Sequence, residues 1–290
     1  MDIFRFLTGG KDKEVLESIN GITLSREDIA RFGDVVHDYS PIHRNVEVAK
    51  QFEFTDTPVI GVHLASIGGR IARNLLSVMQ SPDKTFYFAS QEVTFRDPVY
   101  PGEPINWRID TEQGGENVRS YRLIVPHSDS TKKPRVELVS EFSTERPSPR
   151  TYDPEKLVYR QDIDITPEEV RDFYEGLREA PVKEVPFSLG IARVPSTLLS
   201  FVNDLNATSG KNIGGKNIGM KSTSYGELRT GKTRIDVYEV AKLGRGNRVS
   251  YTFQGVVYQN GQAIIDSEVR TFTNGEIDTN AFKPRYENAA

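Results

Sequence analysis

The chain contains no cysteine and only four histidines among its 290 residues. Without cysteine, disulfide bonds, thiolate nucleophiles and cysteine metal ligands are excluded, and four dispersed histidines do not predict a metal site. The 37 basic and 41 acidic residues are mixed along the chain and give a net charge of only −4, without the basic block that binds nucleic-acid phosphates. We therefore expect no resident metal and no nucleic-acid partner.

Long hydrophobic runs are also missing. No uncharged apolar run approaches the roughly 20 residues that a transmembrane helix needs. The N-terminal stretch has charges inside its apolar part, which is not typical of a signal peptide. A hydrophobic content of 37% is nevertheless enough for a sizeable core. These features predict a globular protein with no membrane partner, and we expect it to be cytoplasmic.

Two segments of the chain share one pattern. Residues 22–32 and 163–173 each read as a short strand, a hydroxyl-bearing N-cap and a helix. Ser25 and Thr166 are the predicted caps, and an acidic residue stands three positions after each, as in a capping box. The repeat predicts that the two halves of the chain are built on one plan.

A glycine-led apolar helix follows in each half, predicted at residues 61–79 and 190–203. Strand-rich sequence follows both helices. The alternating segments of the first half lie at 86–88, 91–95, 105–109, 120–125 and 136–140, and those of the second half at 222–227, 233–240, 248–258 and 263–273. A helix followed by antiparallel strands, given twice, predicts an α+β protein in which each half wraps a sheet around one central helix. Two unrelated α+β domains are the alternative.

The glycine-rich segment 210–219 is interpreted as a mobile loop, because no Gly-Lys-Ser/Thr phosphate motif follows a strand there. The proline-rich stretch 146–154 is interpreted as the connection between the halves. From Phe32 to Gly61 the first half is longer than its counterpart in the second. Only the first half therefore has room for the turn described next.

The extra residues of the first half include Asp38-Tyr39-Ser40-Pro41-Ile42-His43, a segment that places a carboxylate and an imidazole on either side of a proline turn. Proline fixes its own φ and pushes the preceding residue towards extended geometry, so the spacing has a defined shape. Asn45 is the predicted N-cap of a short helix that begins after the turn. The turn therefore presents two proton-transfer groups that can face one water molecule.

The chemistry that such a turn supports is addition of water across a double bond conjugated to a carbonyl. The reaction needs a base for the water, an acid for the neighbouring carbon and a donor for the enolate oxygen. His43 can exchange a proton near neutrality, Asp38 can orient the water, and the Gly61 N–H at a helix start can polarise the carbonyl. Addition of this kind requires no metal, flavin or nicotinamide, and we expect no cofactor.

The turn closely resembles the Asp-x-Asn-Pro-[Ile/Val/Leu]-His signature of the MaoC-like, (R)-specific enoyl-CoA hydratases, a hot-dog-fold family. Phe52, the approach from Pro58 and the helix start at 61–66 are similar to the same family. The likeness covers about residues 22–102. For the second half it depends on pattern alone, as in double hot-dog members in which one repeat keeps the site.

This resemblance implies an α+β double hot-dog fold, with Asp38 and His43 as the catalytic pair and Gly61 as the oxyanion donor. The expected substrate is a trans-2-enoyl or (3R)-3-hydroxyacyl thioester of CoA or acyl carrier protein. The residues expected to contact the substrate are Ser40, Pro58, Val62, His63 and Ser66. The expected boundaries are a first repeat at 1–148, a linker at 149–159, a degenerate second repeat at 160–276 and a tail at 277–290. Open sheet edges would also permit a homodimer.

Four positions depart from the family pattern. Ser40 replaces an asparagine, Ile60 a histidine, Asn45 an aspartate and Gly69 a serine. These changes leave acyl chain length, branching and the direction of the reaction open. Two alternatives also stay open: a hot-dog thioesterase, for which a carboxylate on the central helix is expected but absent from 61–80, and a non-catalytic subunit that binds acyl thioesters.

Overall fold

The structure, a computed structural model, describes residues 21–180, 184–210, 213, 215–245 and 248–279. The chain divides into two compact units, each an antiparallel sheet with one long helix against it. The described part of the first unit comprises residues 21–30 and 41–146. The second unit takes residues 31–40 together with those from 147 onward. The α+β architecture expected from the sequence is therefore present in both units.

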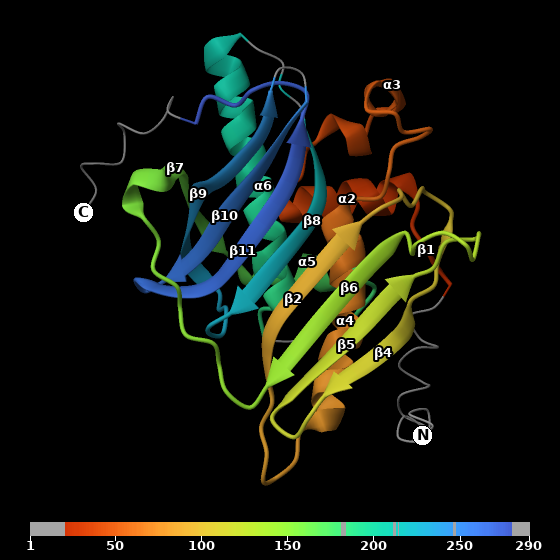
Figure 1. The fold of residues 1–290 in the computed structure, drawn as a ribbon, viewed down its shortest axis with the longest axis vertical. Helices are drawn as coiled ribbons and strands as arrows, with labels where there is room; N and C mark the ends of the chain where they lie inside the picture. Colours follow the sequence, from red (N-terminus) through yellow and green to blue (C-terminus); the bar gives the residue numbers. More distant parts are fainter. Residues whose placement is uncertain (1–20, 181–183, 211–212, 214, 246–247, 280–290) are drawn as a thin grey trace. The chain divides into compact units, whose positions relative to one another are not determined.

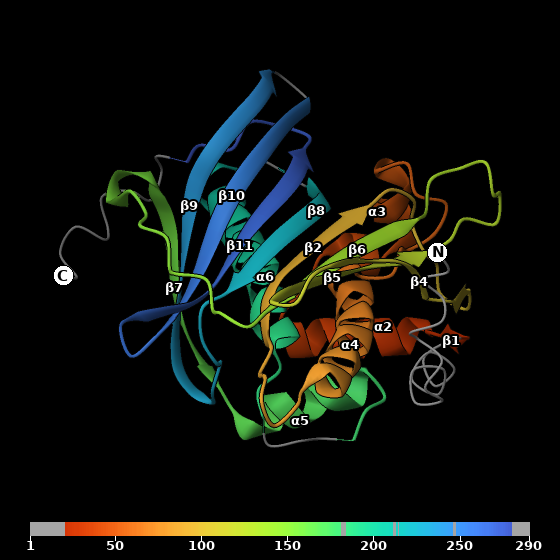
Figure 2. The same cartoon turned by 60° about the horizontal axis from the view of Figure 1, so that its bottom comes forward.

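In the first unit the strand order is β4-β5-β6-β2, with every neighbouring pair antiparallel. The strands are β2 (Tyr87–Phe95), β4 (Arg108–Gly114), β5 (Val118–Val125) and β6 (Val136–Ser143), and a separate pair joins β1 (Ile22–Thr23) to β3 (Pro104–Ile105). Helix α4 (Gly61–Met79) runs along one face of the sheet (Figures 1 and 2). Gly68 permits close packing there, because a Cβ at this position would lie 3.0 Å from the Trp107 ring.

In the second unit the strand order is β8-β11-β10-β9-β7, again antiparallel throughout. The strands are β7 (Leu157–Ile165), β8 (Gly215–Ser224), β9 (Gly231–Arg245), β10 (Arg248–Gln259) and β11 (Gln262–Thr273). Helix α6 (Phe187–Ser209) packs against β7, β9, β10 and β11 (Figure 1). Gly255 of β10 faces this helix, since an added Cβ would come within 2.2 Å of Val194.

The remaining helices are α2 (Arg26–Val36), η2 (Pro41–His43), α3 (Val46–Gln51), η3 (Pro154–Lys156) and α5 (Pro167–Gly176). Both predicted capping boxes are confirmed. Asp28 N donates to Ser25 Oγ and Ser25 N donates to the Asp28 carboxylate, at 3.1 and 2.9 Å. Thr166 and Glu169 make the same reciprocal pair at the start of α5. Each cap satisfies amides that the first helical turn leaves without partners.

Two expectations for the second unit are wrong. Its central helix begins at Phe187 and ends at Ser209, instead of spanning 190–203, because Pro186 is the residue before the first turn and Gly210, at φ 66°, ends the helix. Pro195 lies inside the helix without ending it. Residues 215–219 belong to strand β8 and are not a loop; they pair with β11.

In the first unit the predicted strand at 105–109 is broken. Ile105 ends β3 and Arg108 begins β4, with the buried Trp107 between them. The strands predicted at 86–88 and 91–95 form the single strand β2, with an irregularity between Phe88 and Ser90. The connection at 146–154 has no strand, as expected. Its Tyr152 hydroxyl donates a 2.5 Å hydrogen bond to Asp266 of β11.

Candidate active site

The turn that carries Asp38 begins where helix α2 ends. His37 follows the helix with φ 59°, the left-handed conformation that commonly terminates helices. Asp38 N donates to Gly33 O at 2.8 Å, and Ser40 N donates to Asp38 Oδ1 at 3.0 Å. The half-buried Asp38 carboxylate is thereby fixed by an Asx turn.

His43 lies at the end of η2, directly before the segment that begins α3. Asn45 caps α3 as predicted, since its side chain accepts from Glu47 N and Val48 N. His43 Nδ1 is 2.8 Å from Pro58 O. A carbonyl oxygen can only accept, so Nδ1 donates and the neutral ring has its lone pair on Nε2. The hydrogen bond to Pro58 O therefore orients the His43 ring and leaves Nε2 as its basic nitrogen.

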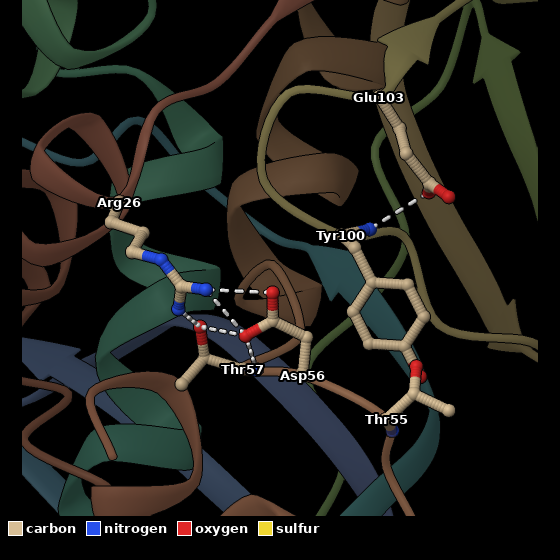
Figure 3. Close-up of polar contacts among 6 residues, drawn as sticks. All are labelled: Arg26, Thr55, Asp56, Thr57, Tyr100 and Glu103. Atoms are coloured by element: carbon tan, nitrogen blue, oxygen red, sulfur yellow. Dashed lines mark hydrogen bonds and ion pairs between the residues drawn. The ribbon is translucent and has the colours of Figure 1, made fainter. Parts of the chain in front are cut away.

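The segment that presents Pro58 O is itself tied down on one side by helix α2. Arg26 makes two 2.7 Å hydrogen bonds to the Asp56 carboxylate and one of 2.6 Å to Thr57 Oγ1 (Figure 3). The hydrogen bond from Arg26 is also the main reason that the pKa of Asp56 is lowered. Thr57 is almost fully buried and directly precedes Pro58.

Strand-side contacts hold the same segment from another direction. Val59 N donates to Val99 O at 2.8 Å. Thr55 N donates to the Tyr100 hydroxyl at 3.2 Å, and Figure 3 shows these two residues. The Glu103 carboxylate accepts from Tyr100 N at 2.9 Å. Residues 55–59 are therefore fixed on both sides before they enter α4. The contacts of Arg26, of Thr55 with Tyr100 and of Val59 with Val99 were not predicted, because their partners are separated by 30 or more residues.

Gly61 is the first residue of α4, and Ile60, its N-cap, provides no side-chain hydrogen bond. The amides of a first helical turn have no intrahelical acceptor and lie at the positive end of the helix dipole. A Cβ on Gly61 would lie 2.9 Å from the Phe95 ring, so close packing against Phe95 also favours glycine at this position. This helix start is a suitable position for binding a developing negative charge.

The other candidate residues lie in mixed surroundings. Val62, His63 and Ser66 are all at most 5% exposed on α4, and Pro58 is also buried. Ser40 is half-buried. Their contact with a substrate stays a prediction.

The described residues include no group of three or more His, Asp and Glu side chains arranged to hold a metal ion. Within the same ranges, no helix is long and apolar enough to cross a membrane.

The structure groups the candidate residues in two sets. His43, Pro58 and Gly61 belong to the first unit, where His43 and Pro58 are in direct contact. Asp38 and Ser40 belong to the second unit, where they form the Asx turn. The boundary between the units thus falls inside the motif, between Ser40 and Pro41.

The two ring nitrogens of His43 can be distinguished in solution. We expect neutral His43 to be protonated on Nδ1, because this nitrogen donates to Pro58 O. His127 is an internal control, since its Nδ1 accepts from Asp129 N at 2.9 Å and its neutral ring should be protonated on Nε2. Long-range ¹H–¹⁵N correlation spectra of ¹⁵N-histidine-labelled protein, recorded under alkaline conditions, should show opposite tautomers. The same Nε2-H tautomer in both would contradict the assignment for His43.

Two sequence comparisons relate part of the chain to dehydratases. Residues 9–128 match the MaoC like domain family. Over 115 residues the chain is 30% identical to a mitochondrial 3-hydroxyacyl-[acyl-carrier-protein] dehydratase of Arabidopsis thaliana, covering 40% of this chain and 64% of that protein. The chain therefore matches less than two thirds of that relative's length.

Solved structures extend the likeness to most of the chain. A MaoC domain dehydratase from Chloroflexus aurantiacus superposes with a TM-score of 0.61 at 11% identity, covering 88% of this chain and 93% of that one. A Mycobacterium tuberculosis protein with a double hot-dog fold gives 0.58 at 8% identity, covering 87% and 93%. At such identities the likeness concerns the fold alone. The chain thus has the double hot-dog fold, and residues 9–128 are similar to the MaoC like domain.

Proposed function

We propose that the protein catalyses the reversible hydration of trans-2-enoyl thioesters to (3R)-3-hydroxyacyl thioesters, or the reverse dehydration. The observation that carries this proposal is the hydrogen bond between His43 Nδ1 and Pro58 O, which leaves Nε2 as the basic nitrogen. The match of residues 9–128 to the MaoC like domain supports the same reaction class. CoA and acyl carrier protein are both suitable carriers, and the cytoplasm is the proposed compartment.

The proposed reaction adds one water across the double bond. His43 Nε2 removes a proton from the water, and the water oxygen bonds to C3. The π electrons move towards the thioester carbonyl, whose oxygen accepts a hydrogen bond from Gly61 N–H. The imidazolium then returns the proton to C2, so that hydroxyl and hydrogen are gained and nothing is released. Asp38 orients the water by accepting a hydrogen bond from its second O–H, which stays intact and becomes the hydroxyl of the product.

A thioesterase and a non-catalytic binding subunit remain the alternatives. Helix α4 of the first unit has no carboxylate along its length, which disfavours the thioesterase. The family match supports a dehydratase and does not distinguish it from an inactive relative.

The test is incubation of the purified protein with a panel of trans-2-enoyl-CoAs of increasing chain length. Loss of the conjugated enoyl absorbance without release of free thiol is the expected result. Thiol release would instead identify a thioesterase. Saturable acyl-CoA binding with neither reaction would show that the proposed activity is absent.

A further inference from the structure

Helix α6 of the second unit has four buried polar residues that the proposed chemistry does not use, and two of them, Arg193 and Ser196, lie close to the Asp38 turn. Arg193 is 3% exposed and Ser196 is 5% exposed, one helical turn apart. A buried guanidinium is costly unless it is paired. Both side chains lie within the unit that also contains residues 31–40, the segment that ends with the Asp38 turn.

Ser196 contacts the end of helix α2. Its hydroxyl is 2.5 Å from Val36 O and 2.9 Å from Ala192 O of its own helix. Val36 is the last residue of α2, and carbonyls at a helix C-terminus have no intrahelical donor. Ser196 therefore supplies a donor to α2 two residues before Asp38.

Arg193 pairs with Glu169, which lies close to His37, the residue after Val36. Arg193 Nη2 forms an ion pair with Glu169 Oε1, and the same oxygen is 3.6 Å from His37 Nε2. Glu169 Oε2 accepts from Thr166 N at 3.0 Å in the capping box of α5, so the carboxylate is held at both oxygens. His37 has φ 59°, a conformation that non-glycine residues rarely adopt. Glu169 therefore lies next to the residue that directly precedes Asp38.

Burial and neighbouring charges shift the pKa values of Arg193 and His37. Burial lowers the pKa of Arg193, and the neighbouring Glu169 opposes that shift. Burial lowers the pKa of His37 as well, and the charge of Arg193 adds to the effect while Glu169 acts against it.

We propose that Glu169, Arg193 and Ser196 are positioning residues for Asp38. The second repeat, which lacks the catalytic turn, would then be retained because its α5 and α6 helices fix the turn of the first repeat's motif. The expected effect on kcat rests on the proposed hydratase function. The anchoring of the turn can be measured by hydrogen–deuterium exchange, which does not require activity.

The hydroxyl contact is tested with Ser196→Ala, with Ser200→Ala as the matched control. Ser200 lies one turn further along α6 and its hydroxyl donates only to the helix carbonyl of Ser196, at 3.1 Å. We expect Ser196→Ala to lower kcat for enoyl-CoA hydration by about tenfold, because small displacements of catalytic groups cost up to about a hundredfold. KM and the activity of Ser200→Ala should stay within about twofold of wild type.

The ion pair is tested with Glu169→Gln, with Arg160→Lys as the control. Arg160 of β7 pairs with the buried Asp236 of β9, and 2.7 Å separates Arg160 Nε from Asp236 Oδ1. We expect Glu169→Gln to lower kcat by about ten- to hundredfold, whereas Arg160→Lys should lower only the melting temperature. Glutamine keeps an acceptor for the α5 cap, so the helix should survive.

Hydrogen–deuterium exchange provides the readout that is independent of chemistry. In Ser196→Ala and Glu169→Gln, exchange should be faster in peptides covering 33–40 and unchanged in peptides of β9 to β11. Equal exchange and equal kcat in each variant and its control would overturn the inference. Faster exchange with an inactive wild-type protein would support the anchoring and reject the hydratase function alone.

Discussion

Replacement of Asp38 by asparagine or of His43 by alanine should each reduce kcat for enoyl-CoA hydration by about 10²- to 10⁴-fold, the usual contribution of a general acid or base. Asparagine retains the oxygen that accepts from Ser40 N, so the Asx turn should persist while the charge is lost. Alanine at position 43 removes the ring that contacts Pro58 O and, with it, the basic nitrogen. Initial rates across substrate concentrations would measure kcat and KM separately.

Two matched variants control for the removal of a charge or an imidazole. Asp34→Asn changes an exposed carboxylate on α2, and His127→Ala removes a ring from a polar loop after β5. Both should retain wild-type rates, and all four proteins should keep their far-ultraviolet circular dichroism. Wild-type kcat in folded Asp38→Asn or His43→Ala would show that the reaction does not use the pair.

Replacement of Gly61 by proline should lower kcat by about 10²- to 10³-fold, the usual cost of losing one oxyanion donor. Proline has no N–H, and it is well tolerated at the first position of a helix. Ile60 already has φ −58° and ψ 127°, the extended geometry that a following proline requires. The substitution therefore removes the donor without breaking α4.

Gly61→Ala is the control, because alanine and proline bring the same Cβ towards the Phe95 ring, where it would lie 2.9 Å away. Alanine keeps the amide. The effect of displacing Phe95 is therefore common to both variants, and the ratio of their kcat values isolates the N–H. A ratio near one would contradict the oxyanion role of Gly61.

Local signals in the sequence predicted several features of both units. The caps at Ser25, Asn45 and Thr166 were readable because each side chain bonds to amides two or three residues away. The start and end of α4 were also predicted, because a glycine begins and a polar residue follows its apolar run. The proline turn indicated the chemistry because its motif is contiguous.

Contacts between distant residues were not predictable in this way. Arg26 meets Asp56 over 30 residues, and Ser196 meets Val36 over 160. No spacing rule reports such pairs, since they depend on how the helices pack. The early start of α6 was missed because Gly190 was used as the marker of the helix start, whereas the helix begins at Phe187, directly after Pro186.

The departure at Ser40 illustrates what the structure adds to a motif. In the sequence, Ser40 stands where the family signature has an asparagine. The hydrogen bond that closes the turn uses the backbone N–H of Ser40, donated to Asp38 Oδ1. Any residue other than proline can supply that donor, so serine at this position is compatible with the turn.

The most direct test of the central claim is the configuration of the product that the wild-type protein forms from trans-2-butenoyl-CoA. Chiral chromatography of the released acid should give a single enantiomer, because the proposed pair delivers hydroxyl and proton from one fixed side of the substrate. The resemblance of residues 38–43 to the (R)-specific hydratases predicts that this enantiomer is (3R)-3-hydroxybutanoate. A racemic or (3S) product, or unchanged enoyl thioester at high protein concentration, would contradict the account.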